Sequence, residues 1–176
     1  YMCDEEAEWY PDINDIKSKI TSRTKGIVII NPNNPTGLLT DPDLLVRILD
    51  KAERLGILLV LDECFLDFTG QEERSLISYI NETEYLFVLK SFTKMYAMPG
   101  IRLGYGISKN RVLLERMEAA GQCWGVSVLA SAAGIAELGE REYRQKAVEL
   151  VKRERAYLKE KLQEAGMQVW DGQADY

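Results

Sequence analysis

Three runs of consecutive apolar residues, rich in Val, Ile and Leu, stand out along the chain. They occupy residues 25–31, 57–63 and 85–91, and a weaker run follows at residues 101–108. Apolar runs without alternating polar positions are typical of strands buried on both faces of a parallel sheet. We therefore expect three buried strands, and a fourth strand at residues 101–108.

Between the first two runs, apolar residues recur at helical spacing. We predict a helix at residues 40–56, because Leu45, Ile48 and Leu49 share one helical face and Gly56 follows as a stop signal. Strand, helix and strand in this order indicate a crossover connection. The sequence thus predicts an α/β fold with a mostly parallel sheet.

The pattern changes after residue 108, where helical spacing replaces the apolar runs. We expect three further helices, at residues 109–121, 126–139 and 140–165. We also expect a short helix before the third strand, at residues 75–83, and the start of another strand near the end, at residues 167–170. Small apolar residues give way to Lys, Glu and Arg near residue 140. We therefore place a domain boundary there and divide the chain into residues 1–138 and 139–176.

Composition narrows the class of protein and its partners. Of the 176 residues, 46% are hydrophobic and 28% charged, and the net charge is −6, which argues against nucleic acid or an anionic membrane as the main partner. No apolar run approaches the roughly 18 residues needed to span a bilayer. The cysteines, Cys3, Cys64 and Cys123, are odd in number and widely spaced, so we expect no disulfide framework and a reducing cytoplasm.

The chain has no histidine, which excludes Ser-His-Asp and Cys-His catalysis and His-ligated metal sites. We expect no metal, and chemistry that uses Lys, Asp, Tyr, Ser, Thr or a cofactor. The chain begins at Tyr1 without an initiator methionine and stops at Tyr176. We therefore expect it to be part of a longer protein.

Polar residues follow each of the three predicted parallel strands. Asn34 lies just past the first, Asp62 at the end of the second, and Ser91, Thr93 and Lys94 at the end of the third. In open α/β sheets, ligands bind outside the carboxyl ends of the strands. Each residue also has an ordinary structural reading, as a turn residue, a strand cap or a surface lysine. Their convergence on one sheet edge is what favours a site.

Three motifs together resemble the pyridoxal-phosphate (PLP)-dependent aminotransferases of class I/II. They are NPNNPTG at residues 31–37, DECF at residues 62–65, and SFTK with a following arginine at residues 91–102. The spacings match that family as a set: 28 residues from Asn34 to Asp62, 32 from Asp62 to Lys94, and 8 from Lys94 to Arg102. The resemblance runs along the whole chain.

The resemblance implies a role for each motif residue. Lys94 would bind the cofactor as a Schiff base, Asp62 would face the pyridine nitrogen, and Asn34 would donate a hydrogen bond to the phenolic oxygen. The phosphate clamp would consist of Ser91, Thr93 and Arg102. An arginine fork with hydroxyl groups suits a phosphate dianion better than a point charge does.

One position departs from the common pattern of the family. Many members have Tyr three residues after the aspartate, where this chain has Phe65. A Phe here resembles the branch that contains threonine-phosphate decarboxylase and some histidinol-phosphate aminotransferases. The opening segment, residues 1–37, is more similar to alanine-forming and general class I aminotransferases.

The resemblance implies a fold-type I large domain, a mostly parallel sheet with helices on both faces, of which this chain would be an incomplete part. Residues 1–138 would be its central part, and residues 139–176 a long helix and the start of a small C-terminal domain. The ring-stacking aromatic residue, a phosphate loop and the arginine for the substrate carboxylate would lie outside the chain. We therefore expect the 176-residue chain alone to be inactive.

For the intact protein the resemblance implies a cytoplasmic homodimeric transaminase that moves an amino group between an amino acid and a 2-oxo acid. One alternative keeps PLP but decarboxylates a phosphorylated amino acid. Another is a non-catalytic, aminotransferase-like domain that senses a ligand. That reading calls for a DNA-binding segment, and no stretch of this chain is basic enough to supply one.

Overall fold

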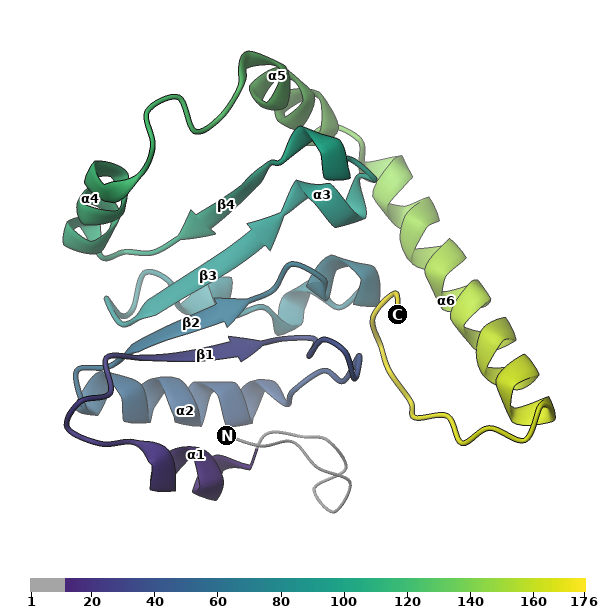
Figure 1. The fold of residues 1–176 in the computed structure, drawn as a ribbon, viewed down its shortest axis with the longest axis horizontal. Helices are drawn as coiled ribbons and strands as arrows, with labels where there is room; N and C mark the ends of the chain where they lie inside the picture. Colours follow the sequence, from purple (N-terminus) through teal and green to yellow (C-terminus); the bar gives the residue numbers. More distant parts are fainter. Residues whose placement is uncertain (1–11) are drawn as a thin grey trace.

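A computed structural model describes residues 12–176 (Figure 1). Its centre is a four-stranded sheet with the strand order β1-β2-β3-β4, in which the first three strands are parallel and the fourth is antiparallel. The strands are β1 (Gly26–Ile30), β2 (Leu58–Asp62), β3 (Leu86–Ser91) and β4 (Gly104–Ile107). Each lies inside a predicted range, so the α/β fold with a mostly parallel sheet is confirmed.

The crossover from β1 to β2 is helix α2, Pro42–Arg54. Asp41 caps it, because its side chain accepts a hydrogen bond from the backbone N–H of Asp43, and Pro42 occupies the first turn, where its missing N–H costs nothing. The helix ends at Arg54, and Leu55 is its C-cap. Gly56, with a φ of 65°, then turns the chain into β2.

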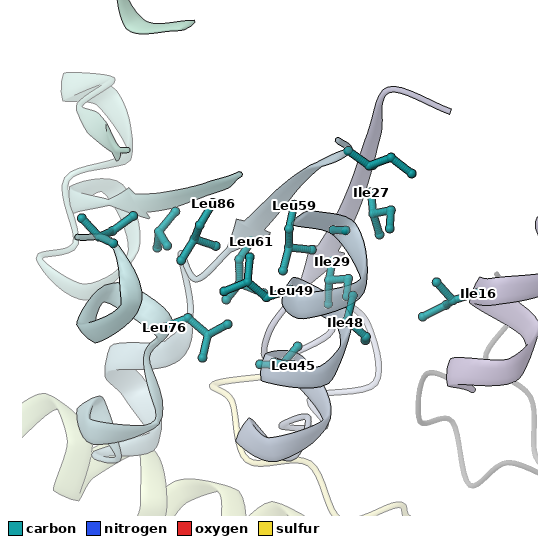
Figure 2. Packing of buried hydrophobic residues seen from close by; sticks show 14 residues of the cluster. Ile16, Ile27, Ile29, Leu45, Ile48, Leu49, Leu59, Leu61, Leu76 and Leu86 are labelled. Atoms are coloured by element: carbon teal, nitrogen blue, oxygen red, sulfur yellow. The ribbon is translucent and has the colours of Figure 1, made fainter. Parts of the chain in front are cut away.

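The core lies between one face of the sheet and α2. Leu45, Ile48 and Leu49 of α2 point toward Ile29, Leu59 and Leu61 of the strands (Figure 2). These residues are at most 3% exposed, and burying each such side chain contributes about 1.5–3 kcal/mol. On the opposite face of β1, Val28 is 58% exposed. The two helices within residues 12–54, Ile13–Lys19 and Pro42–Arg54, thus cover only one face of β1.

Helices dominate the chain after β3. They are α3 (Phe92–Met95), α4 (Arg111–Ala120), α5 (Val128–Glu137) and α6 (Arg141–Glu164). Short 3-10 helices occupy Leu66–Thr69, Glu72–Arg74, Leu76–Tyr79 and Pro99–Ile101. The three long predicted helices are present. The sequence pattern did not indicate α1 (Ile13–Lys19), a short helix that Asp12 caps and whose Ile16 is buried.

The strand predicted to begin at residues 167–170 is wrong. These residues have no regular secondary structure and belong to a tail that returns from α6 toward the carboxyl end of β1 (Figure 1). A strand needs a neighbouring strand for its hydrogen bonds, and no strand of residues 12–176 lies beside this segment. The division into residues 1–138 and 139–176 stays a prediction.

Cys64 and Cys123 are free thiols, and Cys3 lies outside the described residues, as do residues 1–11 of the opening segment. Over residues 12–176, no helix combines the length and the apolar character needed to span a membrane.

Candidate active site

The predicted site residues meet at the carboxyl edge of the sheet. Asp62 is the last residue of β2 and Ser91 the last of β3, and the turn at residues 31–37 follows β1 directly. The strands are in register there, since Ile30 lies opposite Asp62 and Asp62 opposite Leu89. The expected convergence of three strand ends is therefore present.

Alternation along the strands separates two sets of polar residues. Successive side chains of a strand point to opposite faces. Asp62 and Ser91 therefore lie on the face that carries Val28. Their chain neighbours Glu63 and Lys90 lie on the opposite face, which packs against α2.

The turn after β1 is built by its own asparagines. Buried Asn31 accepts a hydrogen bond from the backbone N–H of Thr40 (2.8 Å), and the amide of Asn33 donates to the hydroxyl of Thr36 (2.9 Å). The Asn31–Pro32 and Asn34–Pro35 peptide bonds are cis. Asn34 stands exposed near the tip of the turn.

Lys94 is presented by the short helix α3. Ser91 caps this helix: its hydroxyl accepts from the N–H of Thr93 (3.1 Å), and the two hydroxyl oxygens lie 2.7 Å apart. Phe92 and Met95 are buried and fix the helix against the sheet, while Lys94 is exposed. The helix thus presents an exposed lysine directly after Thr93 in the chain, and two hydroxyls that lie side by side.

Phe65, three residues after Asp62, lies next to Lys94. The Lys94 ammonium is 5.4 Å from the centre of the Phe65 ring. The Asp62 carboxylate accepts a hydrogen bond from the backbone N–H of Cys64 (3.0 Å). Burial, together with a hydrogen bond and the charge of Asp62, raises the pKa of the Cys64 thiol to about 12. Phe65 also meets the ring of Tyr176 edge-on, with 4.9 Å between centroids.

Arg102 lies just before β4, with a φ of 58°. Its guanidinium is exposed and donates to the carbonyl of Pro99 (3.0 Å). The chain passes close to β3 at this point: a Cβ on Gly104 would stand 2.9 Å from the carbonyl oxygen of Lys90. Glycine at residue 104 therefore lets Arg102 stay near the end of β3.

These residues fit a phosphorylated aldehyde cofactor with a basic ring nitrogen. Within residues 12–176, neither Lys94 nor Arg102 nor Asp62 forms a salt bridge, although all three carry charge. They offer an amine for an aldehyde, a guanidinium with two hydroxyls for a phosphate, and a carboxylate for a protonated ring nitrogen.

Sequence reasoning missed a buried ionic cluster on the α2 face. The Lys90 ammonium lies 3.2 Å from Glu63 and 3.0 Å from Asp67, and Glu63 also accepts from the Ser75 hydroxyl (2.5 Å). Burial alone lowers the pKa of Lys90, but the carboxylates of Asp67 and Glu63 outweigh it and raise that pKa above its ordinary value. Arg144 of α6 pairs with Glu72 beside this cluster. A lysine inside an otherwise apolar strand was the available signal.

The same edge of the sheet is also contacted by the tail that follows α6. Its Tyr176 packs on Phe65, and burial, Asp175 and Asp62 raise the pKa of the Tyr176 phenol to about 12. This contact could not be predicted from the sequence, because it joins residues far apart in the chain.

Comparison with known proteins identifies the family. The family described as "Aminotransferase class I and II" matches residues 1–176. The chain belongs to this aminotransferase family. Members of the family are PLP-dependent enzymes, so the predicted family and cofactor are confirmed.

Individual relatives of this aminotransferase-family chain differ in activity. It is 34% identical to the threonine-phosphate decarboxylase of Salmonella typhimurium over 97% of the chain and 47% of that protein. It is 35% identical to the histidinol-phosphate aminotransferase of Methanosarcina barkeri over 89% of the chain and 40% of that protein. The crystal structure of the histidinol-phosphate aminotransferase from Clostridium acetobutylicum superposes with a TM-score of 0.90 at 33% identity, over 98% of the chain and 51% of that protein. The chain thus spans about half the length of these relatives.

Proposed function

We propose that this chain carries the cofactor-binding part of a PLP-dependent aminotransferase, which transfers an amino group between an amino acid and a 2-oxo acid. One observation carries the proposal. The charged groups at the site edge, Lys94, Arg102 and Asp62, have no ionic partner within residues 12–176. By contrast, Lys90 near the end of β3 is held by two carboxylates. Charges kept without partners at a strand end suit a charged ligand.

PLP, when bound, supplies an electron sink for the negative charge that develops at the substrate Cα. Lys94 would bind its aldehyde carbon and then carry a proton to and from the substrate Cα. Asp62 would keep the proton on the ring nitrogen, and Asn34 would donate to the phenolic oxygen. The hydroxyls of Ser91 and Thr93, already 2.7 Å apart, would bind the phosphate together with Arg102.

A decarboxylase is the second candidate. Support comes from the similarity to the Salmonella typhimurium enzyme, which extends over 97% of the chain, and from Phe65 in place of the usual tyrosine. Both reactions need the same binding residues. Incubation of the intact protein with phosphorylated and ordinary amino acids separates them, because only decarboxylation releases CO2 and only transamination consumes a 2-oxo acid.

We also propose that the intact protein is a homodimer. The segment 121–138 exposes an apolar surface, since Trp124 is 96% exposed and Val128 85%. Leu129, Ile135 and Leu138 extend this surface along α5. Exposed patches of this kind mark interfaces. Light scattering of the intact protein with and without Leu129→Glu tests the proposal: a dimer that persists unchanged in the variant contradicts this interface.

Covalent labelling tests the aminotransferase assignment directly. The intact protein is loaded with PLP, reduced with borohydride and mapped by peptide mass spectrometry. The label is expected on Lys94 and lost in Lys94→Ala, with Lys51→Ala, an exposed lysine of α2, as the control that keeps it. A label on any other lysine contradicts the assignment.

A further inference from the structure

The tail after α6 holds the turn that carries Asn34, taken here with the two residues that follow it as residues 31–39. Gln173 makes two hydrogen bonds to this turn: its backbone N–H donates to the carbonyl of Gly37 (2.7 Å), and its side-chain oxygen accepts from the N–H of Leu39 (2.9 Å). We call this pair of bonds the Gln173 clamp. It joins residues 134 positions apart in the chain.

The tail beside the clamp is packed closely. Ala174 is fully buried, and its carbonyl accepts a hydrogen bond from Arg155 of α6 (2.5 Å). A Cβ on Gly172 would stand 3.2 Å from the carbonyl oxygen of Thr36 and 3.3 Å from the Cα of Gly37, whose φ is 69°. Two glycines therefore let the backbones of tail and turn touch.

The turn needs such support on its outgoing arm. Its incoming arm is continuous with β1, and Asn31 fixes the backbone at Thr40 (2.8 Å). Between these points, the bond from Gly37 N–H to the carbonyl of Asn33 (2.7 Å) closes the turn within itself. The Gln173 clamp ties the segment just after the tip, at Gly37 and Leu39, to the tail that follows α6. A binding group must be held within about 0.5 Å by its surroundings to be effective.

We propose that Gln173 is a positioning residue for the cofactor, which acts by holding the turn at residues 31–39 so that Asn34 stays at the sheet edge. The inference rests on the proposed function, because it takes Asn34 as a cofactor ligand. It adds a role for a residue on the other side of α6, outside all three motifs. It also makes cofactor affinity depend on the placement of the tail.

Two measurements on the intact protein test this inference. Hydrogen exchange at the Leu39 amide, without PLP, reports the clamp itself, and titration with PLP followed by absorbance reports the affinity. Gln173→Leu keeps the bulk of the side chain but removes the acceptor oxygen. We expect exchange at Leu39 about tenfold faster or more and PLP binding about fivefold weaker, the effect of one lost hydrogen bond.

Three further variants make the result decisive. Gln173→Glu keeps an acceptor oxygen and should restore slow exchange at Leu39, while Gln168→Ala, an exposed glutamine of the same tail, should change neither measurement. Unchanged exchange at Leu39 in Gln173→Leu overturns the clamp. Weaker PLP binding in Asn34→Ala but not in Gln173→Leu overturns the positioning role alone. No loss in either variant overturns the Asn34 assignment of the proposed function, and the inference with it.

Discussion

Glu63 and Lys90 form a buried ion pair, with 3.2 Å between carboxylate and ammonium, on the face of the sheet opposite to the candidate site. Each is the immediate neighbour in sequence of a proposed cofactor ligand, Asp62 and Ser91. Because side chains alternate along a strand, the pair links the ends of β2 and β3 on the face that packs against α2. Paired charges thus serve the fold on one face, and Asp62 on the other face has no ionic partner within residues 12–176.

The pair should stabilise the protein measurably. Glu63→Gln keeps the shape of the side chain and one acceptor oxygen for the backbone N–H of Leu76. It replaces the oxygen that accepts from the Ser75 hydroxyl with an amide NH2 group and removes the negative charge beside Lys90. Breaking a buried pair at one partner costs about 3 kcal/mol. We expect the free energy of unfolding in urea to fall by that amount.

Glu82→Gln is the matched control, because Glu82 is exposed and forms no salt bridge within residues 12–176. Its free energy of unfolding should stay within about 0.5 kcal/mol of the unchanged protein. Equal stability of the two variants would mean that Asp67, 3.0 Å from Lys90, suffices to hold the lysine by itself.

The sequence predicted the strands, the long helices and the site edge, because each depends on local pattern or on strand order. Apolar runs define β1 to β3, and the carboxyl ends of parallel strands necessarily share an edge. The Glu63–Lys90 pair and the Gln173 clamp depend on which distant residues meet, which no local pattern encodes. The strand predicted at residues 167–170 failed for the same reason: a strand exists only where a partner strand lies beside it.

Cys64 should be an unreactive thiol. Burial, the hydrogen bond with Asp62 and the charge of Asp62 raise its pKa to about 12, so very little thiolate is present at pH 8. We expect alkylation by iodoacetamide at pH 8 about a hundredfold slower than for an unperturbed thiol, after allowing for the greater nucleophilicity of a basic thiolate. Exposed Cys123 provides the comparison within the same molecule.

The same reaction reports the charge of Asp62. Asp62→Asn removes the carboxylate that opposes ionisation of Cys64, so the thiol pKa should fall and alkylation at pH 8 should become about tenfold faster. Asp50→Asn, on the exposed face of α2, should leave the rate unchanged. An unchanged rate at Cys64 in Asp62→Asn would show that burial alone controls this thiol.

Asp62 should matter for turnover more than for cofactor affinity. An amide cannot hold the ring nitrogen protonated as a carboxylate does, so Asp62→Asn should lower the kcat of the intact, PLP-saturated protein about a thousandfold, or ~4 kcal/mol of barrier. The kcat is compared at saturating amino acid, with Asp50→Asn as control. Turnover within threefold of the unchanged protein would refute the role of Asp62.

Phe65 departs from the family pattern and lies beside Lys94, the lysine proposed to bind the cofactor, with its ring centre 5.4 Å from the Lys94 ammonium. A tyrosine here would add a phenol that donates to the cofactor's phenolic oxygen and stabilises its anionic form. One hydrogen bond to a charged group is worth about 1.5–3 kcal/mol. Phe65→Tyr should therefore shift the pH midpoint of the visible absorption band of the PLP-loaded, intact protein downward by about one unit or more.

The measurement is a spectrophotometric pH titration of both forms, together with urea unfolding to verify that the fold is kept. The edge-on contact between Phe65 and Tyr176, with 4.9 Å between centroids, gives a second check. Tyr176→Phe removes the phenol of the tail, whose pKa of about 12 keeps it neutral during the titration, and should leave the midpoint unchanged. A midpoint that stays or rises in Phe65→Tyr would mean that residue 65 does not face the cofactor, since a new donor at the phenolic oxygen can only favour its anionic form.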